Sequence, residues 1–434
     1  MTPPVRKPGA ESSPGRSSAQ GPPVESEAGG WRQAAARYRS DLILFFASLA
    51  IYALASDGLL AHQSLAPQFV YQADAFLHGQ LSLTVPHPPN LNDWVLWNGR
   101  WYVSFPPFPA VLMMPFVALF GLSLNDVAFT LFFSAANVAL LYRFLRRLQP
   151  ERAEWEHVAF ALIYGFGTLA FCCGIRGEVW FTAETIGVTL TLLYLHAALG
   201  ARHPVLAGLA VACGAITRTP LAFSAIFFVF EALSPDGPLE WRKLRDPARW
   251  RSALPGLLPY ILAILAVAIP MAAMNLARFG NLSEFGHSHL YANRVNAQIR
   301  QYGLFHYAFL ERNLHDAFTR LPEISFHPLR IGFDGEGMSL FVTTPLFLYL
   351  LWPKEKPRLH RALWLTVAVV AIPGFFYQNS GYYQFGFRFS LDYTPYLIIL
   401  LALGARRLTG YFSLTALASV VVNTWGAAVF NRLY

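Results

Sequence analysis

The sequence predicts an all-α fold, a polytopic bundle of transmembrane helices, and three observations support this prediction. First, about eleven apolar runs approach the length that a helix needs to cross a bilayer. Second, 55% of the 434 residues are hydrophobic and only 13% are charged, against roughly 25% in soluble domains. Third, basic residues cluster in the short segments between the runs. The clearest runs are 41–61, 125–142, 156–174, 179–199, 254–277, 362–378 and 411–430.

Residues 1–36 differ from the rest of the chain. They are rich in Pro, Ser, Gly and charged residues, so they could not bury a core and are predicted to form a disordered cytoplasmic tail. Residues 37–434 form the transmembrane domain in this interpretation. The formal net charge of +8 is carried by loops between apolar runs rather than by one face. We therefore expect the lipid bilayer, and not nucleic acid, as a partner.

Lysine and arginine predict which loops face the cytoplasm, because both are enriched on the cytoplasmic side of membrane proteins. Every lysine can be placed on one side together with the arginine clusters at 143–147, 242–251, 358–361 and 406–407. This arrangement puts the N-terminus in the cytoplasm. It leaves the outer loops 62–105 and 279–337 on the non-cytoplasmic side.

Two apolar segments fit this topology only if they are not simple crossings. The run 106–121 is short and rich in proline, and it is predicted to be re-entrant or interfacial. The run 204–232 is predicted to form two short helices that meet at Thr217-Arg-Thr-Pro220, because a proline and a buried charge break a long span.

The outer loop 62–105 is predicted to lie against the bilayer, because it is rich in Trp and Tyr, which favour the headgroup layer. Residues 67–78 carry apolar side chains at helical spacing, so we expect a juxtamembrane helix that lies flat on the membrane. Asp74 and His78 would share the polar side of this helix. They form either an acid–base pair directed at a cavity or part of a solvated helix face.

A second polar feature opens a predicted transmembrane helix near residue 390. Arg388 and Asp392 lie four residues apart among aromatic residues and glycines. Burying either charge costs about 2.5–3.5 kcal/mol at the middle of a bilayer. Arg388 either pairs with Asp392 or holds a phosphate through its planar fork of donors. Arg218 and Arg176 pose the same alternatives at the same predicted level of the membrane.

A series of short motifs runs along most of residues 40–434. They are Ala73-Asp-Ala-Phe-Leu-His-Gly79, Asn98-Gly-Arg-Trp-Tyr102, Pro106-Pro107, Gly177-Glu-Val-Trp-Phe-Thr182, Thr217-Arg-Thr-Pro220, Ala277-Arg-Phe-Gly280, Glu284-Phe-Gly286, Gly337-Met-Ser-Leu340, Thr344-Pro345 and Gln384-Phe-Gly-Phe-Arg388, followed by Asp392 and Pro395. In order and spacing, this series resembles the C-type membrane glycosyltransferases, the superfamily of protein mannosyltransferases and aminoarabinose transferases.

This resemblance implies transfer of a sugar from a polyprenyl-phosphate-linked donor to an envelope glycan, lipid or protein, at the non-cytoplasmic face of a bacterial inner membrane. Known members use an acidic residue of the first outer loop as the base on the acceptor hydroxyl, while basic groups stabilise the leaving phosphate. The predicted catalytic residues are Asp74, His78 and Glu178, with Asp57 and Glu184 as reserve acids. The residues predicted to bind the donor or its phosphate are Arg388, Arg218, Arg176, Tyr102 and Gln384.

Two positions depart from the family pattern. The family's acidic residue usually precedes the juxtamembrane helix, where Ser64 or Pro67 stands here. Many relatives also carry a basic residue just before the Pro-Pro pair, where this chain has Phe105.

The sequence gives little support to a metal cofactor, and it leaves two functions of other classes open. His287 and His289 lie close together in the second outer loop, but scattered surface histidines are far commoner than metal sites, and no metal or other cofactor is predicted. The alternatives to a transferase are a transporter or flippase of lipid-linked precursors and a non-catalytic subunit of an envelope-assembly complex.

Overall fold

The computed structural model describes residues 1–2, 27–235, 237–291 and 293–430. The chain divides into two compact units, residues 1–40 and residues 41–434. The predicted disordered tail, residues 1–36, falls mostly on residues 3–26, outside the described residues. Helix α1 (Glu27–Ser56) begins before the end of that predicted tail. The elements that position the functional site all belong to the second unit.

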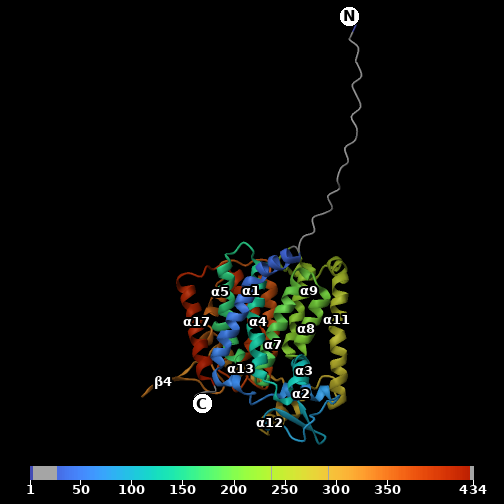
Figure 1. Ribbon diagram of the computed structural model, residues 1–434, viewed down its shortest axis with the longest axis vertical. Coiled ribbons are helices and arrows are strands. Elements are labelled where there is room, and N and C mark those ends of the chain that lie inside the picture. The colour runs from blue at the N-terminus through green and yellow to red at the C-terminus, as the bar shows by residue number, and fades with distance from the viewer. Residues whose placement is uncertain (3–26, 236, 292, 431–434) are drawn as a thin grey trace. The chain divides into compact units, whose positions relative to one another are not determined.

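Apolar helices of the second unit run beside one another (Figure 1). Among the described residues, five helices are long and apolar enough to cross a membrane. They are Tyr38–Ala61 (the end of α1 with the 3₁₀ helix η1, Asp57–Ala61), α4 (Asp126–Leu148), Val179–Ala201 (α7, Val179–Ala198, with η3, Leu199–Ala201), α11 (Pro247–Phe279) and α17 (Gly410–Val429). The predicted total of about eleven spans is not confirmed, because other apolar runs form shorter or broken helices.

The shorter helices show why the predicted count is not reached. They are α3 (Phe108–Phe120), α5 (Glu154–Gly167), α6 (Ala170–Gly174), α8 (Pro204–Ala215), α9 (Ala225–Leu233), α15 (His360–Phe376) and α16 (Thr394–Leu403). The run 156–174 is divided between α5 and α6, where the Thr168 hydroxyl oxygen accepts a hydrogen bond from the Ala170 N–H at 3.2 Å. The run 204–232 is divided as predicted, because α8 ends before Arg218, and η4 (Thr219–Ser224) and α9 follow it.

Helix α3 occupies most of the run that was predicted to be re-entrant or interfacial. Its 13 residues extend only about 20 Å at 1.5 Å per residue, less than the roughly 30 Å of a bilayer core. The Phe108 N–H at its start donates to the carbonyl of Ile216 at 3.1 Å. Helix α3 therefore begins beside the break that follows α8.

Helix α2 (Gln68–Leu77) confirms the predicted helix in the first outer loop. Its apolar side chains, however, are covered by protein rather than by lipid. Phe69, Val70 and Ala73 are buried in one cluster with Met113 and Val117 of α3. The expectation that the apolar face of this helix rests on the membrane is therefore wrong, because α3 occupies that face.

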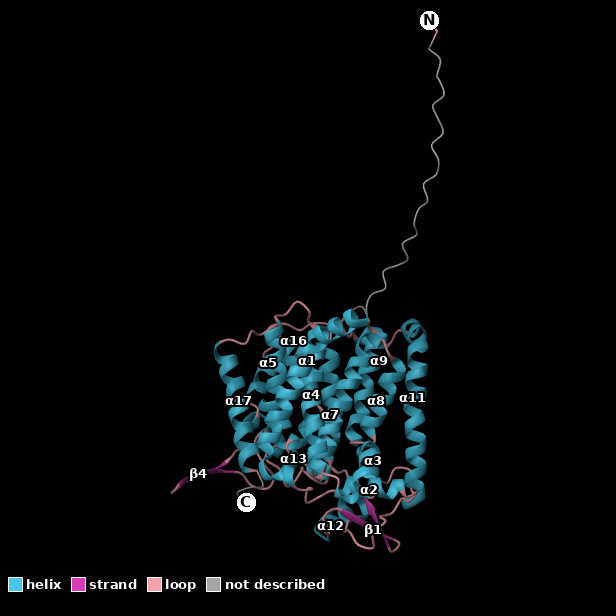
Figure 2. Ribbon diagram, viewed as in Figure 1, coloured by secondary structure: helices cyan, strands magenta, loops and turns pink. Residues whose placement is uncertain are grey.

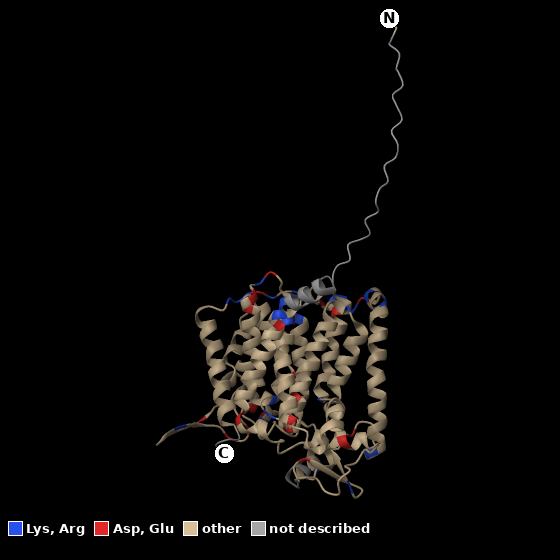
Figure 3. Cartoon of the chain, in the orientation of Figure 1, with Lys and Arg blue, Asp and Glu red and all other residues tan. Residues whose placement is uncertain are grey.

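The loops between the helices gather at two ends of the second unit, as the basic residues predicted. The two outer loops share one end, where Val95 pairs with Leu290 and the Tyr291 N–H donates to the carbonyl of Trp94 at 2.8 Å. At the other end, the Arg358 guanidinium binds the Glu231 carboxylate at 2.7 Å. Most described Lys and Arg residues lie at that second end (Figure 3). Which end faces the cytoplasm stays a prediction.

Two antiparallel β-hairpins interrupt the helical fold, and both lie at the end of the outer loops (Figure 2). The first pairs β1 (Trp94–Trp97) with β2 (Arg100–Val103). Its turn has φ of 49° at Asn98 and 74° at Gly99, as a tight Asn-Gly hairpin turn requires. The second pairs β3 (Glu323–Phe326) with β4 (Leu329–Gly332).

The remaining elements of the described chain are short helices. They are η2 (Gly121–Ser123), α10 (Trp241–Leu244), η5 (His287–His289), α12 (Asn293–Tyr302), η6 (Tyr307–Phe309), α13 (Leu310–Phe318), α14 (Leu340–Thr343), η7 (Pro345–Leu351) and η8 (Arg388–Asp392).

Candidate active site

A cavity of about 590 Å³ lies between the two outer loops and the broken helices. Its lining divides into an apolar part and a polar part. The apolar part includes Phe223, Leu304, Phe305, Ile372 and Phe376. The polar part includes Asp93, Arg218, Glu284, His287, Arg388 and Asp392. The cavity thus combines a hydrophobic wall with charges of both signs.

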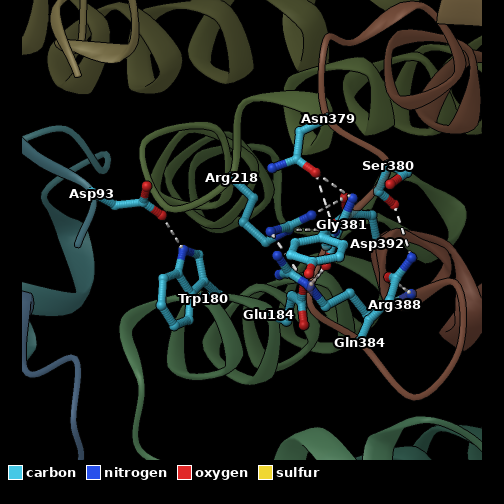
Figure 4. Close-up of polar contacts among 11 residues, drawn as sticks. Asp93, Trp180, Glu184, Arg218, Asn379, Ser380, Gly381, Gln384, Arg388 and Asp392 are labelled. Carbon is cyan, nitrogen blue, oxygen red and sulfur yellow. Dashed lines mark hydrogen bonds and ion pairs between the residues drawn. The ribbon is translucent and has the colours of Figure 1, made fainter. Parts of the chain in front are cut away.

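Two arginines and two carboxylates form a connected network beside this cavity (Figure 4). Arg388 donates from Nη1 to Glu184 Oε1 at 2.5 Å, and Arg218 Nη1 lies 3.5 Å from the same oxygen. Arg218 also donates from Nε and Nη2 to the two oxygens of Asp392, at 2.5 and 2.8 Å. A single carboxylate, Glu184 of α7, therefore joins two guanidiniums that come from different segments of the chain.

Arg388 does not pair with Asp392, so this alternative from the sequence is wrong. The reason is the type of helix. Residues four apart face each other on an α-helix, but η8 is a 3₁₀ helix, which has three residues per turn and turns the fourth residue away by about 120°. Asp392 therefore pairs with Arg218 instead.

Arg388 retains donors for a ligand. Its Nε–H donates to the Gly381 carbonyl at 2.9 Å, and its Nη1 donates to Glu184. A guanidinium has five N–H donors, so three of them have no hydrogen-bond partner among the described residues. The ring of Phe389 lies against both arginines, 5.2 Å from Arg388 Cζ and 5.3 Å from Arg218 Cζ. Arg388 is therefore positioned by the protein without being saturated by it.

Asp93 is the carboxylate of the first outer loop that lines the cavity, and sequence reasoning did not select it. It sits just before β1 with φ of 57°, a conformation that Asp tolerates better than most residues. The Trp180 Nε1–H at the start of α7 donates to Asp93 Oδ2 at 3.0 Å. Burial raises the pKa of the Asp93 carboxyl, while the Trp180 hydrogen bond and the positive charge of Arg388 oppose that shift. A carboxylate with a raised pKa is a stronger proton acceptor than an exposed one.

Two further ionisable residues of the second outer loop line the cavity. Burial lowers the pKa of the His287 imidazole to about 4, so this side chain is neutral near pH 7. The rings of Phe105 and Tyr377 lie 5.8 and 6.5 Å from it. Burial alone would raise the pKa of Glu284, but hydrogen bonds from Ser288 and Gly286 outweigh it and lower that pKa. Glu284 therefore stays ionised.

The structure does not bring the predicted pair Asp74 and His78 to the cavity. Asp74 Oδ2 accepts a hydrogen bond from the Thr84 hydroxyl at 2.5 Å, and Asp74 Oδ1 lies 3.6 Å from His78 Nδ1. His78 is exposed, and neither residue belongs to the cavity lining. Asp57, a reserve acid, is also exposed and outside the lining. The solvated-face alternative therefore fits His78, whereas Asp74 is held by Thr84 outside the cavity, and its side chain is only 13% exposed.

Four other predicted site residues have partners elsewhere in the fold. Arg176 and Glu178 form a buried pair through two hydrogen bonds, at 2.5 and 3.2 Å. Tyr102 packs against Phe279 at 5.4 Å. The Gln384 side chain donates to the carbonyls of Glu336 and Ser380 and accepts the Arg388 N–H at 2.9 Å. None of the four predicted residues lines the cavity, although Gln384 supports the backbone of Arg388.

The described residues contain no group of three or more His, Cys, Asp or Glu side chains arranged to hold a metal ion. His287 and His289 share η5, but the His289 ring lies against Trp97 at 4.0 Å rather than beside His287 in the cavity lining.

No protein-family model matches this sequence, and no curated protein sequence matches it. Several solved structures are similar to it over most of its length. ArnT from Cupriavidus metallidurans bound to undecaprenyl phosphate is 15% identical, with a TM-score of 0.49, over 87% of this chain and 62% of its own. The apo state of ArnT is 16% identical, with a TM-score of 0.48, over 88% of this chain and 61% of its own. A third structure is AglB, an oligosaccharyltransferase from Archaeoglobus fulgidus, in complex with an inhibitory peptide and a dolichol-phosphate. It is 13% identical, with a TM-score of 0.43, over 88% of this chain and 56% of its own. Both proteins are C-type membrane glycosyltransferases, and this chain spans less than two thirds of their length.

Proposed function

We propose that this protein is a membrane glycosyltransferase that moves a sugar from a polyprenyl-phosphate-linked donor to an acceptor hydroxyl. The observation that carries this proposal is the lining of one cavity by two arginines, a carboxylate of raised pKa and an apolar wall. The acceptor is an envelope glycan, lipid or protein. Transfer takes place on the non-cytoplasmic side of a bacterial inner membrane, with the N-terminus in the cytoplasm.

Arg388 binds the phosphate of the donor in this proposal. Its unpaired N–H donors are available to phosphate oxygens, and charge-assisted hydrogen bonds from a guanidinium are strong and geometrically specific. Arg218 supports it from the same lining, although Asp392 and Glu184 engage that side chain more fully. Phe223, Phe305 and Phe376, on the apolar part of the lining, would contact the first isoprene units of the lipid.

Asp93 is the general base in this proposal. As the acceptor oxygen attacks the anomeric carbon, the hydroxyl proton passes to the Asp93 carboxylate, and the bond from the anomeric carbon to the phosphate oxygen breaks. The leaving polyprenyl phosphate takes the electron pair of that bond, and the two guanidiniums stabilise its charge. One displacement of this kind inverts the configuration at the anomeric carbon.

The substitution Asp93→Asn tests this assignment. The amide oxygen of the new side chain can still accept the Trp180 N–H, so the loop is expected to fold, while the proton acceptor is lost. Purified protein in lipid nanodiscs is incubated with a panel of radiolabelled polyprenyl-phosphate sugars and envelope extract. Turnover should fall roughly 10²–10⁴-fold in Asp93→Asn, with donor binding nearly unchanged.

Asp74→Asn is the matched control, because Asp74 is an acid of the same outer loop that lies outside the cavity. It should retain turnover within a few-fold of the parent. If Asp74→Asn is inactive and Asp93→Asn is active, the assignment of the base is wrong. If the parent transfers no sugar from any donor of the panel, the transferase proposal itself fails.

A further inference from the structure

The β3–β4 hairpin of the second outer loop has two chemically different faces. In its register, Ile324 lies opposite Ile331, and Phe326 lies opposite Leu329. Alternate residues of a strand point to the same side, so these four apolar side chains share one face. Ser325 and Arg330, a directly opposed pair, belong to the other face. The hairpin is therefore amphipathic, and we call the side with Ile324, Phe326, Leu329 and Ile331 its apolar face.

The apolar face has no cover among the described residues. Its four side chains are 52% (Ile324), 72% (Phe326), 70% (Leu329) and 55% (Ile331) exposed. An isolated two-stranded hairpin is marginally stable in water, and an apolar surface of this kind marks a site of interaction. The hairpin extends past the outline of the helices, beyond the end of α17 (Figure 1). No residue of either strand lines the cavity.

The base of the hairpin is fixed to the helical part of the protein. The Arg320 guanidinium binds Asp316 of α13 at 2.7 Å and Asp334, which follows β4, at 2.6 Å. The Ser339 N–H donates to the Arg320 carbonyl at 2.9 Å. The hairpin is thus held at the end of the spanning helices, where a bilayer surface would lie.

We propose that the apolar face of the hairpin inserts into the headgroup and acyl boundary of the bilayer, with the Ser325 and Arg330 face towards water. The position of the hairpin supports a lipid partner. It lies beyond the end of α17 (Figure 1), a helix that is long and apolar enough to cross a membrane and that exposes Leu414, Leu417 and Val421. An amphipathic element at this level buries its apolar face about 5–10 Å into the boundary.

Two other occupants fit the observations less well. Pairing with a strand of another protein would use the backbone edges of the hairpin and would not require all its large apolar side chains on one face. A second copy would have to be held by about 500 Å² per chain, taking about 200 Å² for each partly exposed large side chain, less than the roughly 800 Å² of a standard interface. This proposal is independent of the transferase activity.

A fluorescent amino acid that reports local polarity tests the proposal when it is incorporated singly at 326 or 329. Matched controls carry it at 325 or 330, on the opposite face of the same strands. Because all four side chains are exposed, none of these replacements removes core packing. The full chain is reconstituted in vesicles of phosphatidylcholine and phosphatidylglycerol, with or without lipids spin-labelled high on the acyl chain.

At 326 and 329, emission should shift to the blue, spin-labelled lipid should quench most of it, and aqueous iodide should quench little. At 325 and 330, iodide should quench and the lipid label should not. Equal quenching of all four sites by iodide would show a hairpin in water and overturn the proposal. Protection of 326 and 329 from both quenchers would overturn it in favour of a protein cover. Loss of that protection on dilution into excess lipid would identify the cover as a second copy.

Discussion

Replacing Asp392 by asparagine should destabilise the protein more than a typical charge substitution, because it breaks a buried ion pair. Asp392 and Arg218 are joined by two hydrogen bonds, at 2.5 and 2.8 Å, and their side chains are only 4% and 12% exposed. Removing one partner of a buried pair costs about 3–5 kcal/mol, whereas an exposed pair contributes roughly 0.2–1 kcal/mol. Glu184 remains 3.5 Å from Arg218, so we expect the lower end, about 3 kcal/mol.

A double-mutant cycle separates the pair from its surroundings. Arg218→Met alone removes the charge partner of Asp392 and should cost a similar amount. The double variant, Arg218→Met with Asp392→Asn, leaves neither charge unpaired and should be more stable than the sum of the single effects predicts. The free energy of unfolding is measured by steric trapping in lipid bicelles. A loss below about 1 kcal/mol in Asp392→Asn, or strict additivity in the cycle, would refute the buried-pair reasoning.

Three further outcomes are expected from the same geometry. Arg388→Lys keeps the charge but loses the fork of donors, so its affinity for undecaprenyl phosphate should fall about tenfold or more. Arg176→Lys, an equally buried control outside the cavity, should lower stability and leave that affinity unchanged. Equal losses of affinity in both variants would point to a general folding effect. Burial raises the pKa of Asp93, and only its ionised form accepts a proton. On acidification, kcat/KM should therefore decline at a pH above the ordinary aspartate pKa of about 3.9. A decline confined to lower pH would contradict the proposed role of Asp93 as the base. The variant Arg330→Cys should react with an impermeant thiol reagent added to intact cells and Arg245→Cys should not; the reverse pattern would invert the topology.

The helix break and its arginine were predictable because proline and charge act locally. Thr217-Arg-Thr-Pro220 cannot continue a buried helix, whatever the rest of the fold does, and α8 does end there. Helical periodicity likewise predicted α2. What periodicity could not reveal was the partner of the apolar face of α2, because α3 is equally apolar and a lipid surface would satisfy the same pattern.

The proposed base, Asp93, and the partners of the two arginines depend on contacts between residues far apart in the sequence, which local sequence patterns cannot predict. Asp93 reaches the cavity through a left-handed residue in an irregular loop, and its partner Trp180 is 87 positions away in the chain. Asp74 had the better local pattern, a helix with a histidine one turn on, yet neither residue belongs to the cavity lining. Of the two alternatives left open for Arg388, the pair with Asp392 rests on four-residue spacing in an α-helix, and η8 is a 3₁₀ helix.

The balance of charge in the network also explains how the cavity can hold arginines before any donor arrives. Two guanidiniums and the carboxylates of Glu184 and Asp392 sum to no net charge, so neither arginine is left as an uncompensated charge in a membrane protein. Glu184 and the Gly381 carbonyl fix the direction of the Arg388 guanidinium, and three of its N–H donors have no partner among the described residues. A leaving phosphate would then meet donors already in position, and no reorganisation would be needed as its charge develops. In the proposed mechanism, Glu184 and Asp392 act on catalysis through the arginines, and only Asp93 exchanges a proton with the acceptor.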